Sequence, residues 1–195
     1  MEIDGNTSYK QRRFFNYSTG YLLAIFVLLL FIPFQKNSAE NQCENGNKFN
    51  LSIFNENDYK FQSKSCHEKN GVILKYYLIN HSNSKSDYLG EYSEFSAKEE
   101  PKIRAVSVYH SKNKKDPLLI LIISSYFCCT PQLEGYAYKV GIYRFSLKNN
   151  DISIEDVTSQ VFGKRASGFE GKLDRTLNFK YKNIASIKRW LDKHY

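Results

Sequence analysis

The stretch Leu118–Ile123, LLILII, decides how this chain folds, because it is six consecutive apolar residues that start just after Pro117. An apolar run without alternation is typical of a strand that is covered on both faces. A strand of this kind lies in the interior of a sheet rather than at its edge. We therefore expect residues 118–123 to form a central strand.

Segments on both sides of this run show the two-residue periodicity of half-buried strands. The run at 103–109 precedes it, and a long run at 136–147 follows it. The cleanest alternation comes last, at 173–182, where Leu173, Leu177 and Phe179 share one face. The complete set of further strands that we expect is 49–53, 72–79, 103–109, 136–147, 152–154 and 173–182.

The chain closes with a helical pattern that begins at Asn183, a good N-cap residue, and runs to about His194. At 100° per residue its apolar side chains, with Trp190 among them, fall on one arc, which we expect to pack on the sheet. The order of elements predicts an α+β fold. Its expected form is a mainly antiparallel sheet of six or seven strands with this amphipathic helix packed on it, preceded by an N-terminal hydrophobic signal or anchor helix.

The amino terminus predicts export. Three basic residues at 10–13 precede an apolar run at 21–34, whose fourteen residues rise only about 21 Å as a helix, less than a ~30 Å hydrocarbon core. Extension to 17–34 makes the run just long enough to anchor the chain in a membrane, so a cleaved signal peptide and a retained signal-anchor both stay open. We expect residues 1–39 to be the cytoplasmic basic segment with this signal, and 40–195 to be one exported domain.

Cys43, Cys66, Cys128 and Cys129 all follow the export segment, and an even number of cysteines in an oxidising compartment favours disulfides. Adjacent side chains on a strand point to opposite faces, so Cys128 and Cys129 are expected to pair with the two distant cysteines. The alternative is a strained, redox-active bond between the neighbours. His67 follows Cys66, but the CxxC spacing of a zinc site is absent, and we expect no metal or other cofactor.

The formal net charge of +8 comes from the ends of the chain. Residues 164–193 hold nine bases and three acids, whereas residues 40–163 are balanced. Export, the excess of Lys over Arg and the absence of an RNP-like or helix-turn-helix pattern argue against nucleic-acid binding.

The longest segment without a core pattern is 81–101, in which aromatic and acidic residues alternate. A long connection with this composition predicts a protein-binding surface, and the alternative is a solvated loop with an edge strand near 88–92. The partner-binding candidates are Tyr88, Glu91, Tyr92, Glu94 and Phe95.

The segment 163–172, GKRASGFEGK, combines three glycines with three bases, Lys164, Arg165 and Lys172. These bases are candidates for binding an anion. Phe169 and Glu170 occupy the positions at which a P-loop needs Lys and Ser or Thr, so the alternative is an ordinary glycine-rich loop.

No GxSxG, HExxH or SxxK nucleophile motif occurs in a plausible frame, so the sequence names no catalytic residue. The resulting hypothesis is a non-catalytic, exported binding protein with a protein partner, of the inhibitor or toxin-immunity type. If the source is a bacterium, this protein is expected in the periplasm or at the outer face of the inner membrane. The alternative is an envelope enzyme, a hydrolase or one with thiol chemistry, whose active site is unrecognised.

Overall fold

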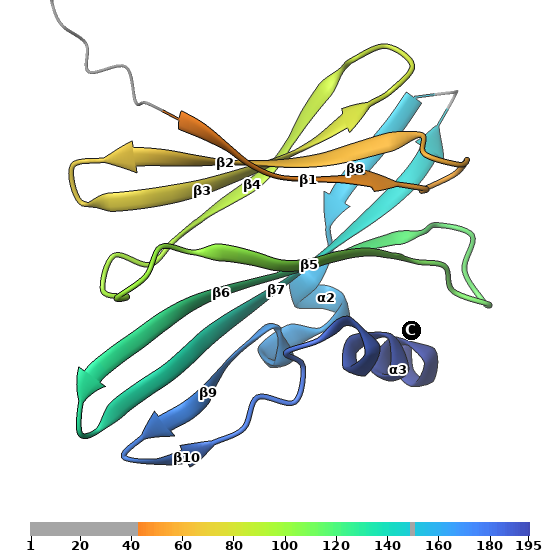
Figure 1. Cartoon of the computed structure of the whole chain (residues 1–195). Coiled ribbons are helices and arrows are strands. Elements are labelled where there is room, and N and C mark those ends of the chain that lie inside the picture. The colour runs from red at the N-terminus through yellow and green to blue at the C-terminus, as the bar shows by residue number, and fades with distance from the viewer. Residues whose placement is uncertain (1–42, 149–150) are drawn as a thin grey trace, which may run out of the picture. The chain divides into compact units, whose positions relative to one another are not determined.

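The computed structural model describes residues 43–148 and 151–195, which form ten strands and three short helical segments. The predicted signal or anchor at 17–34 lies outside the described residues. Four strands form one antiparallel sheet, sheet A, in the order β1-β2-β3-β4 (Figure 1). Their bounds are β1 Cys43–Leu51, β2 Tyr59–Glu68, β3 Gly71–Asn80 and β4 Ser86–Ser93.

Sheet B contains the other six strands. Five of them follow the order β10-β9-β7-β6-β5, and β8 pairs with residues 143–148 of β7, which do not pair with β9. Its strands are β5 Lys102–Tyr109, β6 Leu118–Thr130, β7 Leu133–Lys148, β8 Asp151–Asp156, β9 Ser167–Leu173 and β10 Arg175–Leu177. The helical segments are α2 Thr158–Val161, the 3-10 turn η1 Gly163–Ala166 and α3 Ile184–His194.

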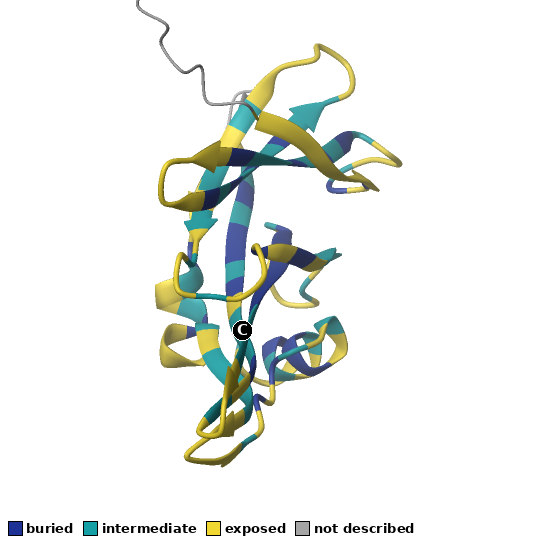
Figure 2. Cartoon of the chain, turned by 60° about the vertical axis from the view of Figure 1, so that its left-hand side comes forward, coloured by how far each residue is buried: buried dark blue, intermediate teal, exposed yellow. Residues whose placement is uncertain are grey.

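The predicted central strand is confirmed in β6, which lies between β5 and β7. Its first eight residues are all buried, and the two faces of the apolar run enter different cores. Leu119 and Leu121 pack in a cluster with sheet A, whereas Leu118 and Ile120 pack in a cluster with α3. The run is therefore apolar throughout because sheet B has a layer on each side, as the buried residues in Figure 2 show.

The cluster between the sheets joins the inner faces of both. Phe61 and Leu78 of sheet A are fully buried in it, together with Phe145 of sheet B. Tyr76 and Tyr143 meet across the interface with their rings 6.5 Å apart, and the Tyr143 hydroxyl donates to that of Tyr76 at 3.4 Å. Burial raises the pKa of both tyrosines, so both hydroxyls stay protonated in this core.

The predicted C-terminal helix is confirmed. The Asn183 side chain accepts the backbone N–H of Ser186 at 2.9 Å, which caps α3. Ile187 and Leu191 are buried against sheet B. Trp190, which is predicted to lie in the core, packs against this cluster but is only partly buried.

The predicted α+β fold with one sheet of six or seven strands is wrong, because the described chain is mainly β and has two separate sheets. The predicted segments overlap β1, β3, β5, β7 and β8, but they miss β2 and most of β9, and a two-residue period carries no information on which strands pair. Strands β1 to β4 pair in chain order through short turns, and the connection after β4 leads into the second sheet. Among the helical segments of residues 43–148 and 151–195, only α3, with eleven residues, is longer than four residues.

The single strand predicted at 173–182 is also wrong. Strand β9 ends at Leu173, and Asp174 turns the chain with a φ of +55° before the three-residue β10. Residues 178–183 are then a loop, in which Phe179 and Tyr181 are nevertheless buried in the α3 cluster. Alternating burial thus persists in a segment whose backbone pairs with no strand.

Candidate functional site

The candidate site is a cleft beside α3, and it depends on how the 178–183 loop is held. Glu170 of β9 accepts the backbone N–H of Phe179 at 2.7 Å and the Lys182 ammonium at 2.6 Å. The hydrogen bond from Lys182, with the one from Phe179, lowers the pKa of Glu170. The Phe179 ring stacks on Tyr138 of β7 at 5.6 Å, so the loop is fixed by both a charge and an aromatic contact.

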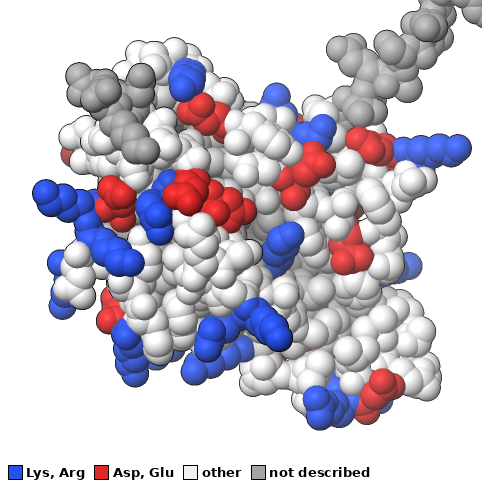
Figure 3. All heavy atoms as spheres, turned by 180° about the vertical axis from the view of Figure 1, so that it is seen from behind, with Lys and Arg blue, Asp and Glu red and all other residues white. Residues whose placement is uncertain are grey.

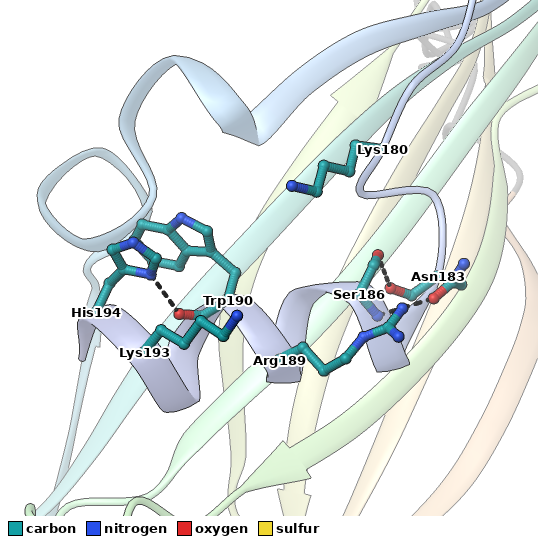
Figure 4. Close-up of a pocket in the computed structure, with 7 residues that line it drawn as sticks. All are labelled: Lys180, Asn183, Ser186, Arg189, Trp190, Lys193 and His194. Carbon is teal, nitrogen blue, oxygen red and sulfur yellow. Dashed lines mark hydrogen bonds between the residues drawn. The ribbon is translucent and has the colours of Figure 1, made fainter.

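The loop and the outer side of α3 enclose a cleft of about 450 Å³ (Figure 4). Lys180 and Asn183 line it from the loop, and α3 provides the other five side chains of the wall. The residues that line it are Lys180, Asn183, Ser186, Arg189, Trp190, Lys193 and His194.

Trp190 forms the aromatic wall of this cleft. The His194 ring lies parallel to it with a centroid distance of 4.6 Å, and the His194 Nδ1 is 2.8 Å from the Trp190 carbonyl oxygen. The guanidinium of Arg165 lies 5.3 Å from the indole centroid. The Phe162 ring meets the indole in a T-shaped arrangement with a centroid distance of 5.0 Å. The indole is therefore held in one orientation by packing on several sides.

The cleft is electropositive. Lys180, Arg189 and Lys193 line it, and its seven described lining residues include no carboxylate. Of the nearby acids, Glu170 is bound to Lys182 and Asp192 accepts the Tyr109 hydroxyl at 3.0 Å. Seen from behind, Lys and Arg side chains also predominate along the lower part of the molecule (Figure 3). The arrangement is suited to bind an anionic group beside a flat aromatic surface.

The structure brings one of the three predicted anion-binding bases to this site. Arg165 in η1 contacts Trp190, whereas Lys172 lies on β9 opposite Glu134 of β7. Lys164 is exposed in η1 and does not line the cleft. The predicted glycine-rich loop is therefore a 3-10 turn followed by a strand. Sequence reasoning missed Lys180, Arg189 and Lys193, although the polar side of the predicted helix already contained the last two.

The predicted partner-binding residues are divided between different surfaces. Tyr88 is 54% exposed on the outer side of sheet A, where its hydroxyl donates to Glu91 at 2.8 Å and its ring packs on Tyr77 at 5.5 Å. Tyr92 packs in the opposite direction, against the core between the sheets. Glu94 and the exposed Phe95 follow the end of β4. They do not form one continuous surface, and the edge strand considered as the alternative is β4.

All four cysteines form disulfides, as predicted, but the predicted pairing is wrong. Cys43 of β1 lies directly opposite Cys66 of β2 and is bonded to it. Cys128 is bonded to Cys129, because a bulge near the end of β6 removes the usual alternation of neighbouring side chains. Two disulfides are compatible with a location outside the cytoplasm.

Within the described residues, no group of three or more His, Cys, Asp or Glu side chains is placed to hold a metal ion. The helices in the same part of the chain are too short or too polar to cross a membrane. Comparisons with protein-family models, with curated proteins and with solved structures find no significant match to this chain. The functional argument therefore rests on the site itself.

Proposed function

We propose that this chain is a non-catalytic, exported binding protein whose α3 cleft receives an acidic group of a protein partner. The observation that carries the proposal is the grouping of Lys180, Arg189 and Lys193 around the stacked Trp190. Tryptophan and arginine are the side chains that most often dominate protein interfaces, and an indole already fixed by its neighbours loses little freedom on binding. Three cations without a lining carboxylate select a partner with acidic side chains.

A binding role accounts for the chemistry of the site better than the alternative, an envelope enzyme. The described cysteines are all in disulfides in this oxidised form of the chain, so none is a free thiolate that could act as a nucleophile. The one hydroxyl that lines the cleft, that of Ser186, donates to the Asn183 carbonyl within the helix cap. The lining residues fix charge and shape, which are the properties that recognition requires.

Export follows from the basic cluster at 10–13 and the apolar run at 21–34, supported by the two disulfides. In a bacterial source the binding domain would lie in the periplasm, either free or held at the inner membrane by residues 17–34. An exported protein with an electropositive cleft fits an inhibitor or a toxin-immunity protein, which neutralises its partner by covering an acidic surface.

The test compares the full-length chain with the variant Lys180→Glu/Arg189→Glu/Lys193→Glu, each immunoprecipitated from the cell envelope of its own source. The matched control is Lys48→Glu/Lys69→Glu/Lys98→Glu, which changes the net charge equally at exposed lysines that do not line the cleft. Thermal melting of both variants establishes that each is folded.

We expect one stoichiometric partner with the wild type and the control, and its loss with the cleft variant. Toxicity of that partner when it is expressed alone would make the protein an immunity protein. A partner that the cleft variant retains would show that binding occurs elsewhere. A wild-type preparation without any partner would contradict the binding function itself.

A further inference from the structure

The hairpin between β6 and β7 ends in an irregularity that the α3 cleft does not explain. Phe127 lies opposite Gly135, and Thr130 lies opposite Leu133. Two residues of β6, Cys128 and Cys129, therefore face the single residue Glu134 of β7. This is the arrangement of a β-bulge, which leaves an extra residue unpaired.

The backbone at the bulge is unusual. Cys129 has a φ of +84°, in the left-handed region that favours glycine and that other residues rarely adopt. Cys129 is also exposed, and Cys128 is half-buried. The disulfide ties Cys129 to Cys128 while Cys129 has this conformation.

We propose that Cys128–Cys129 is a thiol-exchange site that a dithiol reductant opens while the rest of the protein stays folded. One thiolate of the reductant attacks a sulfur of the pair, the bond between Cys128 and Cys129 breaks, and a mixed disulfide forms. The second thiol of the reductant then displaces the protein sulfur. Two electrons and two protons pass to the protein, which gains two thiols, and the reductant becomes a disulfide.

The second disulfide explains why this reaction is selective. Cys66 is fully buried, and its bond to Cys43 joins β1 to β2 across 23 residues of chain. The fold holds this pair together, so its reduction is opposed by the packing of sheet A. The Cys128–Cys129 bond joins neighbours in sequence and closes no chain loop, and neither residue belongs to a core cluster. Its opening therefore requires no rupture of a sheet.

Opening also has a defined local consequence. Glu134, which faces the pair, accepts a hydrogen bond from the Tyr126 hydroxyl at 3.4 Å. The Tyr126 ring lies 4.9 Å from that of Tyr136, and the Arg104 guanidinium lies 4.9 Å above the Tyr136 ring. When the disulfide is reduced, Cys129 is free to leave its left-handed conformation, and Glu134 opposite it then changes position relative to these rings. The redox state of the bulge is thus coupled to an aromatic surface on sheet B.

The test uses the full-length chain in a series of buffers with increasing ratios of reduced to oxidised dithiothreitol. Thiols are trapped with N-ethylmaleimide, and peptide mapping by mass spectrometry locates them. We expect Cys128 and Cys129 to become labelled at a ratio at least ~10-fold lower than Cys43 and Cys66. Trp190 fluorescence is expected to remain native over that interval, and hydrogen exchange is expected to rise only at residues 126–136.

The variant Cys128→Ser/Cys129→Ser is the control, and it should acquire no label in the same interval. The proposal is overturned if both disulfides open at one ratio together with loss of the native fluorescence, or if Cys43–Cys66 opens first. It is also overturned if unreduced protein already carries free thiols at 128 and 129. These outcomes are independent of whether the α3 cleft binds a partner.

Discussion

The two ends of β6 differ in nearly every physical respect although they belong to one strand. At residues 118–125 every side chain is buried, and alternate side chains enter the two cores. At residues 126–130 burial falls, the pairing with β7 shifts by one residue, and two neighbouring cysteines are bonded. The buried end is regular because both faces must pack, whereas the other end is free to carry an irregular feature. A strand can thus serve as the centre of the fold at one end and as a chemically distinct site at the other.

The largest expected effect comes from truncation at the buried end. Leu121→Ala should lower the free energy of unfolding by about 2–5 kcal/mol, because a fully buried side chain leaves a cavity between the sheets. The matched change Leu173→Ala, at a residue of β9 that is 43% exposed, should change it by less than ~0.5 kcal/mol. Urea denaturation of both variants measures the difference. Equal losses of unfolding free energy would mean that Leu173, which lies opposite Leu133 near the β6–β7 hairpin, is packed as tightly as Leu121.

An intermediate effect is expected where β7 approaches β9 near the bulge. Gly135 has a φ of +155°, and an added Cβ would lie only 2.2 Å from the Glu170 carbonyl oxygen. Gly135→Ala must separate the strands and should cost about 3 kcal/mol of unfolding free energy. At Gly163, where φ is +57° and the space around an added Cβ is open, the same change should cost about 1 kcal/mol. Similar costs at both positions would argue that only backbone conformation, and not strand contact, matters here.

The smallest effect on stability is expected from Glu170, which holds the 178–183 loop beside the α3 cleft. The pKa of Glu170 is lowered in the folded protein, chiefly by Lys182, so its ionised form adds stability above the unfolded pKa of about 4.3. This contribution is lost as the pH falls through that value toward the lower folded pKa. The melting temperature of the wild type should therefore exceed that of Glu170→Gln at neutral pH, and the gap should close in acid.

The variant Lys182→Met tests the cause of this pH dependence. Without the ammonium the pKa of Glu170 should rise toward its ordinary value, and replacement of Glu170 by Gln in this background should have a weaker pH dependence. A gap between wild type and Glu170→Gln that stays constant with pH would show that the carboxylate acts through shape alone.

Much of the secondary structure was predictable because its signals are local. The apolar run at 118–123 indicated a strand covered on both faces, and Asn183 with the spacing of Ile187 and Leu191 indicated the last helix. The strand predicted at 173–182 failed because a two-residue period records only which side chains are buried. Phe179 and Tyr181 are buried from a loop, and the positive φ of Asp174 leaves no clear sign in the sequence.

The candidate site was less predictable because its parts come from separate segments. Arg165 was predicted from the sequence as an anion-binding candidate and lies beside Trp190, but Lys180 and Lys193 lie near it only because Glu170 fixes the 178–183 loop beside α3. The partner-binding candidates at 88–95 illustrate the opposite case, in which neighbours in sequence are directed apart. Tyr88 and Tyr92 would share one face of a regular strand, but the pairing of β3 with β4 is irregular between them, so Tyr88 is exposed and Tyr92 packs against the core between the sheets.

Periodicity and capping act over a few residues, so the amino-acid order alone specified the buried strand at 118–123, the helix after Asn183 and the presence of disulfides. Strand pairing, the bond between Cys128 and Cys129 and the cleft around Trp190 depend on contacts between distant segments and on backbone angles that a residue adopts only under the constraint of its neighbours. They are properties of the assembled layers, because strand pairing and the cleft require partners that local sequence cannot identify, and the Cys128–Cys129 bond accompanies a bulge that forms only when β6 pairs with β7.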